Sequence, residues 1–64
     1  MSVYENVVNL ANKKNMKIAE LERKAELGNG TIGKWQDEKN KPSLNSIEKV
    51  ANALNVKVQT LLRD

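Results

Sequence analysis

The chain contains no cysteine and no histidine. The absence of cysteine excludes disulfides and thiolate metal sites, and the absence of histidine removes the commonest metal ligand and general base. No apolar run approaches the roughly 18 residues that cross a membrane, and the N-terminus has no signal-peptide pattern. We therefore expect a soluble, cytoplasmic protein that binds no metal, no cofactor and no membrane.

The length and the acidic residues give little support to an enzyme. The 64 residues make a single domain, residues 1–64, which would bury only about 60% of its unfolded surface, so we expect no large substrate cavity. Carboxylates between residues 20 and 38 could form pairs, but no Gly-rich phosphate loop, nucleophile elbow or metal-spaced cluster accompanies them. We interpret them as solvated helix faces and expect no catalytic residues and no small-molecule substrate.

Two short apolar stripes within residues 17–38 indicate two helices that face each other across a tight turn. Their members recur at three- and four-residue spacing: Ile18, Leu21, Ala25, Ile32 and Trp35. Leu27 would plug the turn, and Gly28 marks the break between the helices. This is the layout of a helix-turn-helix. The opposite face of the second helix carries Gly30 and Lys34, so it can stay in solvent or enter a DNA groove. Trp35 could stack on a base, but its spacing from Ile32 favours the core.

Three further helices are indicated on either side of this segment. The first covers about residues 3–14, with Val8 partly exposed and an inward face of Val3, Val7, Leu10 and Ala11. The second follows Pro42 and the N-cap Ser43, ends at a left-handed Asn55, and has an inward face of Leu44, Ile47, Val50, Ala51 and Leu54. A last short helix holds Val56, Val58, Leu61 and Leu62.

In this order, the segments YENVVNLANKKNM, LERKAELGNGTIGKW and NKPSLNSIEKVANALNVKVQTLL resemble the DNA-binding domain of phage-repressor-like (XRE-type) helix-turn-helix regulators. The resemblance covers nearly the whole chain. It implies an all-α, compact five-helix lambda-repressor-like domain, with the helix-turn-helix at about residues 17–37 and the third helix in the major groove.

The resemblance also implies a set of DNA-contacting residues. Base contacts are expected from this third helix, the recognition helix, at Asn29, Gly30, Thr31 and Lys34. Asn29 could pair with adenine, and Lys34 could donate to guanine or hold a phosphate. Thr31 could meet a thymine methyl group or a phosphate, and Gly30 would permit close approach of the helix to DNA. Phosphate contacts are expected from Lys13, Lys14, Lys17, Gly33, Lys39, Asn40 and Lys41.

The distribution of charge agrees with these contacts. The net charge of +3 is only a mild indication of a nucleic-acid partner. The lysines at positions 13, 14, 17, 34, 39 and 41 bracket the expected groove-facing surface, although they could also form an ordinary solvated surface. Lys17 occupies the N-cap of the first helix of the motif, where it is either a phosphate contact or a solvated side chain at a poorly capped end.

Three positions depart from the family's usual pattern. Glu26 stands where the turn commonly has a left-handed glycine, a conformation that costs a residue with a Cβ on the order of 1–2 kcal/mol, so we expect a slightly altered turn. Glu22 replaces a small residue, so we expect its stem along the helix interface and its carboxylate turned outward. Ile18 replaces a frequent glutamine that contacts phosphate, so that contact is not carried over.

These features predict a transcriptional regulator that binds double-stranded operator DNA in a sequence-specific manner at the bacterial nucleoid. By resemblance, it would be a phage or mobile-element repressor that acts by operator occupancy as a homodimer. The dimer contact is expected at Val56, Val58 and Leu62. The alternative is an antitoxin-like or adaptor module that uses the same fold to bind protein. An acidic recognition face would favour that alternative, whereas Asn, Gly, Thr, Gly and Lys favour DNA.

Overall fold

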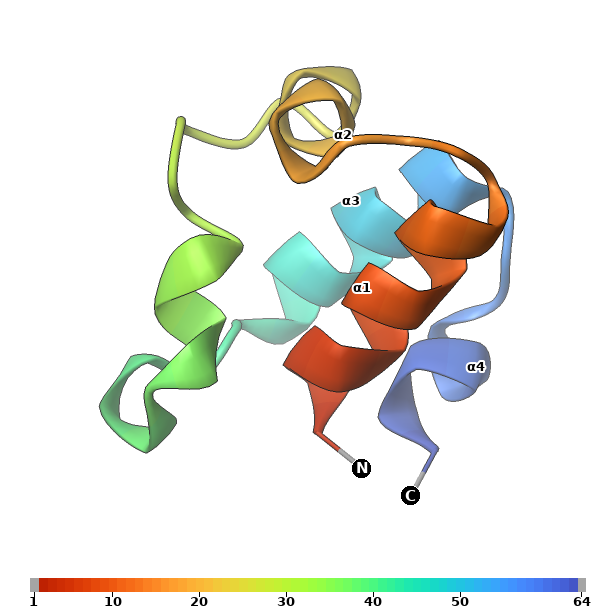
Figure 1. The fold of residues 1–64 in the computed structure, drawn as a ribbon. Helices are drawn as coiled ribbons and strands as arrows, with labels where there is room; N and C mark the ends of the chain where they lie inside the picture. The colour runs from red at the N-terminus through yellow and green to blue at the C-terminus, as the bar shows by residue number, and fades with distance from the viewer. Residues whose placement is uncertain (1, 64) are drawn as a thin grey trace.

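The computed structural model describes residues 2–63, which form four α-helices and two short 3₁₀ helices, with no strand in that range. These elements are α1 (Val3–Lys13), α2 (Ile18–Lys24), η1 (Gly33–Gln36), η2 (Glu38–Asn40), α3 (Leu44–Leu54) and α4 (Val58–Leu62). Figure 1 shows α2 lying across the end of the α1–α3 pair, α4 beside α1, and the 3₁₀ helices on the opposite side. The all-α prediction is confirmed.

The expected count of five α-helices is not confirmed, because the second helix of the motif is not an α-helix. Residues 29–32 form turns, and only Gly33–Gln36 are helical, with 3₁₀ geometry. Gly30 has a φ of 86°, which no residue of a right-handed helix adopts. Glycine has the lowest helix propensity after proline, so two glycines within four residues favour turns over a regular helix.

The α1 helix begins at a capping box. The Ser2 hydroxyl accepts a hydrogen bond from the Glu5 N–H, and the Glu5 side chain accepts one from the Ser2 N–H. Hydrogen bonds from the Ser2 backbone and then from its hydroxyl lower the pKa of Glu5. The inward face is as predicted, with Val7 and Ala11 fully buried, and Val8 is partly exposed.

Three predicted helix caps are confirmed, at Lys17, Ser43 and Asn55, and the turn after α2 is left-handed. Lys17 caps α2 without a side-chain hydrogen bond, and Glu26 after α2 has a φ of 59°. The Ser43 hydroxyl accepts a hydrogen bond from the Ser46 N–H at the start of α3, and Asn55 ends that helix with a φ of 58°. The loop between α2 and the next segment therefore keeps its left-handed turn despite the glutamate.

One apolar core joins all the elements except η2. It consists of Val7, Ala11, Leu21, Ala25, Ile32, Trp35, Ile47, Val50, Ala51, Leu54 and Leu61. Ile18 and Leu27 are partly buried against it. The prediction that Leu44 faces inward is wrong, because its side chain is 63% exposed. Side chains lean toward the N-terminus of their helix, so the first residue of α3 extends past the core rather than over it.

A buried polar residue that the sequence analysis did not single out fastens the two ends of the domain together. The Asn6 amide nitrogen donates hydrogen bonds of 2.8 Å to the carbonyl oxygens of Leu61 and Arg63. These carbonyls lie at the end of α4, where a helix leaves backbone acceptors without intrahelical partners. Asn6 therefore caps α4 from α1.

Candidate nucleic-acid interface

The recognition segment, residues 28–36, connects α2 to the 3₁₀ helices and lies on one side of the helical core (Figure 1). Ile32 and Trp35 point into the core, where both are buried. Asn29, Gly30 and Lys34 are exposed. Three of the four residues that the sequence predicts for base contact are therefore exposed, and the fourth, Thr31, is half-buried.

Short-range backbone hydrogen bonds shape this segment. The Thr31 N–H donates to the Gly28 carbonyl at 3.1 Å, the Lys34 N–H to the Gly30 carbonyl at 3.3 Å, and the Trp35 N–H to the Ile32 carbonyl at 3.0 Å. Bonds over three residues alternate with one over four residues. The result is a compact bend that keeps Asn29 and Lys34 on the outside.

The prediction that Glu22 turns its carboxylate outward is wrong. Glu22 is only 3% exposed. One carboxylate oxygen accepts a hydrogen bond of 3.1 Å from the Gly30 N–H, and the other accepts one of 2.8 Å from the Ile32 N–H. A buried carboxylate is costly unless hydrogen bonds satisfy it, and these two N–H groups supply such partners. They lie eight and ten residues further along the chain, so the helical pattern of α2 alone could not reveal them.

The glycines of the segment differ in what they require. Gly30 needs its left-handed conformation, with a φ of 86°. A Cβ built on Gly28 would come within 3.3 Å of the Thr31 hydroxyl. A Cβ on Gly33 would meet nothing within 4 Å. The fold of this chain therefore has no steric need for glycine at position 33, and the space beside it is open.

The lysines expected at phosphates fall into two groups, and all of them are exposed. One group comprises Lys13, Lys14 and Lys17, and the other comprises Lys34, Lys39 and Lys41, with Asn40 beside them. Figure 1 shows the end of α1 and the start of α2 on one side of the molecule and the 3₁₀ helices on the other. The structure therefore does not bring the two groups together.

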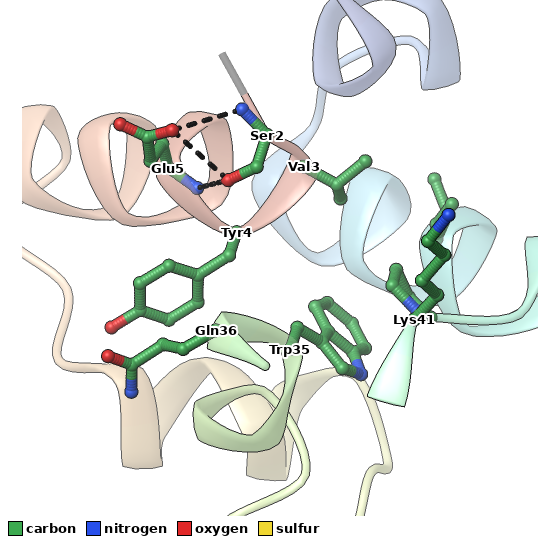
Figure 2. Close-up of a pocket in the computed structure, with 9 residues that line it drawn as sticks. Ser2, Val3, Tyr4, Glu5, Trp35, Gln36 and Lys41 are labelled. Atoms are coloured by element: carbon green, nitrogen blue, oxygen red, sulfur yellow. Dashed lines mark hydrogen bonds between the residues drawn. The ribbon is translucent and has the colours of Figure 1, made fainter. Parts of the chain in front are cut away.

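A cleft of about 680 Å³ separates the start of α1 from η1 and from the segment before α3. Figure 2 shows Tyr4 and Gln36 on one side of Trp35 and Lys41 on the other. The Glu5 carboxylate at its edge is already hydrogen-bonded to Ser2. Among residues 2–63, no group of three or more His, Cys, Asp or Glu side chains is placed to hold a metal ion. No helix in the same range is long and apolar enough to cross a membrane.

The residues expected at a dimer contact surround the end of the domain that α4 forms. Leu62 is 50% exposed, whereas Val56 and Val58 are partly buried against the core. Leu61 is fully buried. Leu62 is thus the large apolar side chain that α4 leaves at the surface; Val58 is the first residue of the same short helix, and Val56 precedes it.

The family model of the Cro/C1-type HTH DNA-binding domain matches residues 6–64. The match includes α2, the recognition segment, α3 and α4. No curated protein and no solved structure gives a significant match to the chain. The domain model describes non-enzymatic DNA-binding regulators and agrees with the resemblance to XRE-type regulators.

Proposed function

Since the chain belongs to the Cro/C1-type HTH DNA-binding domain family, we propose that it is a transcriptional repressor that occupies double-stranded operator DNA as a symmetric homodimer. The observation that carries this proposal is the recognition segment. Its apolar residues are fixed in the core, and its outward face carries only uncharged or basic side chains. The one acidic group beneath it, Glu22, is buried and hydrogen-bonded.

The chemistry of the outward face suits base readout in the major groove. The Asn29 amide has a donor and an acceptor, the pair that adenine presents at N7 and N6. Lys34 can donate to guanine O6 and N7 or to a phosphate. The open space beside Gly33 and the absence of a side chain at Gly30 allow the backbone to approach the DNA closely. Thr31 supplies a methyl group and a hydroxyl at the same surface.

The two lysine groups suit the two phosphate backbones that border a groove. A recognition element in the major groove has one sugar-phosphate strand on each side. Lys13, Lys14 and Lys17 precede the recognition segment in the chain, and Lys39 and Lys41 follow it. Lys17 also lies at the start of α2, where the free backbone N–H groups favour an anion.

The proposed dimer follows from the limited reach of one recognition segment. A single motif contacts too few base pairs for about 10³-fold preference over random DNA, so a second half-site is needed. The exposed Leu62, with Val56 and Val58 beside it, supplies an apolar contact for a second copy. Dimers of this motif space their recognition elements about 34 Å apart, or roughly 10 bp.

Selection of bound sequences from a random duplex library tests this function. We expect the purified protein to enrich inverted half-sites whose centres are about 10 bp apart. Enrichment of one half-site, with binding that is insensitive to half-site spacing, would show that the protein acts as a monomer. Failure to enrich any sequence would contradict sequence-specific recognition.

Two variants distinguish a base contact from a phosphate contact on the selected sequence. Asn29→Ala is expected to lose roughly 1–3 kcal/mol of discrimination at one base pair, because the amide contact to the base edge is removed. Lys39→Ala is expected to weaken all sequences alike, because a phosphate carries no sequence information. Equal losses on specific and random DNA for Asn29→Ala would remove this residue from the base-contacting set.

A further inference from the structure

We propose that Glu22 is a positioning residue for DNA recognition, and that its buried carboxylate holds residues 30–32 in the binding conformation. This inference rests on the proposed function. The carboxylate reaches from α2 to the recognition segment and accepts from Gly30 at 3.1 Å and from Ile32 at 2.8 Å. It thereby fixes the backbone on both sides of Thr31, within the expected base-contacting face.

Both carboxylate oxygens of Glu22 are needed to hold the recognition segment in this shape. The recognition segment has no regular α-helix to hold its shape, and its left-handed Gly30 is free to adopt many other conformations. The Ile32 N–H lies in a buried environment, where a donor without a partner is costly. Each oxygen satisfies one N–H, so a side chain with a single acceptor cannot replace both contacts.

The same contacts change how phosphate can be bound here. Backbone N–H groups at the start of a helical segment are ordinarily available to a phosphate. In this chain the N–H groups of Gly30 and Ile32 already donate to Glu22. These two N–H groups are therefore not available to a phosphate, and Glu22 contributes through the shape of the segment rather than through contact with DNA.

Glu22→Gln and Glu20→Gln form a matched pair for the test. Both replace a glutamate of α2 with its neutral isostere, but Glu20 is exposed, and the hydrogen bonds from α2 side chains to the recognition segment are those of Glu22. Loss of one negative charge should leave DNA affinity unchanged or slightly higher in Glu20→Gln. Glu22→Gln should instead lower affinity for the selected sequence by about tenfold, because the glutamine amide group cannot accept the second hydrogen bond. Affinity for random duplex should match that of Glu20→Gln within about twofold.

Amide hydrogen exchange reports the local change independently of DNA. In Glu22→Gln, exchange at Gly30 and Ile32 should accelerate, while exchange in α1 and α3 should match Glu20→Gln. If Glu22→Gln does not fold, the wild-type protein supplies the readout: the Gly30 and Ile32 amides should exchange slowly, because both donate hydrogen bonds to the carboxylate.

Each outcome separates the positioning role from the function on which it depends. Equal affinity of the two variants for the selected sequence, with unchanged exchange, would overturn the positioning role and leave DNA binding intact. For an unfolded Glu22→Gln, fast exchange of the Gly30 and Ile32 amides in the wild-type protein would overturn it as well. Absence of any duplex binding by the wild-type protein would overturn the proposed function, whereas accelerated exchange would still establish that Glu22 holds the segment.

Discussion

Gly33 is the residue at which folding and DNA binding make different demands. Within the chain, an added Cβ at this position would meet nothing within 4 Å. Glycine is less favourable than alanine in a helix by up to about 1 kcal/mol. Folding alone therefore favours alanine at position 33. We propose that an approaching partner accounts for the glycine, and the predicted partner at this position is a DNA phosphate.

Gly33→Ala should separate the two demands. We expect its free energy of unfolding to stay the same or to rise by up to about 1 kcal/mol. Its affinity for duplex DNA should fall, because the methyl group enters the space that the phosphate would occupy. Chemical denaturation and a binding titration measure the two effects. Gly30→Ala is the control, since its φ of 86° predicts destabilisation by on the order of 1–2 kcal/mol. Undiminished affinity in Gly33→Ala would place this residue outside the interface.

Individual residues were predictable where their chemistry is local. The left-handed Asn55 and the Ser43 N-cap follow from neighbours within four residues, and the structure confirms them. Glu22 was not predictable in the same way. Its partners lie eight and ten residues away, and the helical pattern of α2 shows only that its stem faces the next element. A glutamate where this family usually has a small residue was the available signal, because a buried carboxylate must find hydrogen-bond donors.

At the scale of elements, η1 depends on its anchors more than on its own hydrogen bonds. It is four residues long, far below the length at which a helix is stable by itself. Ile32, just before it, and Trp35, within it, connect it to the core. Trp35 also forms part of the cleft between η1 and α1 (Figure 2). Loss of the indole would therefore detach the element that carries Lys34.

Trp35→Ala should cost about 3–5 kcal/mol, because it removes a large buried side chain from a small core. A domain of this size belongs at the low end of the usual 5–15 kcal/mol of stability, so the variant should be largely unfolded. Thermal melting followed by circular dichroism measures this. Gln36→Ala, an exposed neighbour in the same element, should change stability by no more than about 0.5 kcal/mol. A folded Trp35→Ala protein that loses only DNA affinity would assign the indole to the binding surface.

The α-helices were easier to predict than the recognition segment. Apolar spacing and caps identified α1 and α3 to within about one residue at each end. The spacing of Ile32 and Trp35 correctly predicted which side chains are buried. A separation of three residues fits both α-helical and 3₁₀ geometry, however, so it could not specify the backbone. The two glycines were the signal for an irregular segment.

At the scale of the whole molecule, the placement of charge matters more than its amount. A net charge of +3 is modest, but the lysines from the end of α1 to the start of α2 lie on one side of the molecule, and those in and after the 3₁₀ helices lie on the other. That arrangement could be expected from the order of the elements, because α2 and its turn separate the two groups in the chain. The proposed dimer would place two copies of each lysine group on one operator. Both groups should then increase the affinity of the dimer for DNA.

Binding to duplex DNA as a function of salt concentration tests nucleic-acid recognition by this chain most directly. If exposed lysines neutralise phosphates, the logarithm of the association constant should fall linearly with the logarithm of salt concentration, by about 0.9 for each phosphate contacted. Lys14→Ala and Lys39→Ala should each reduce that slope by about one contact. A slope near zero, or no binding to any duplex at low salt, would contradict the assignment of this surface to DNA.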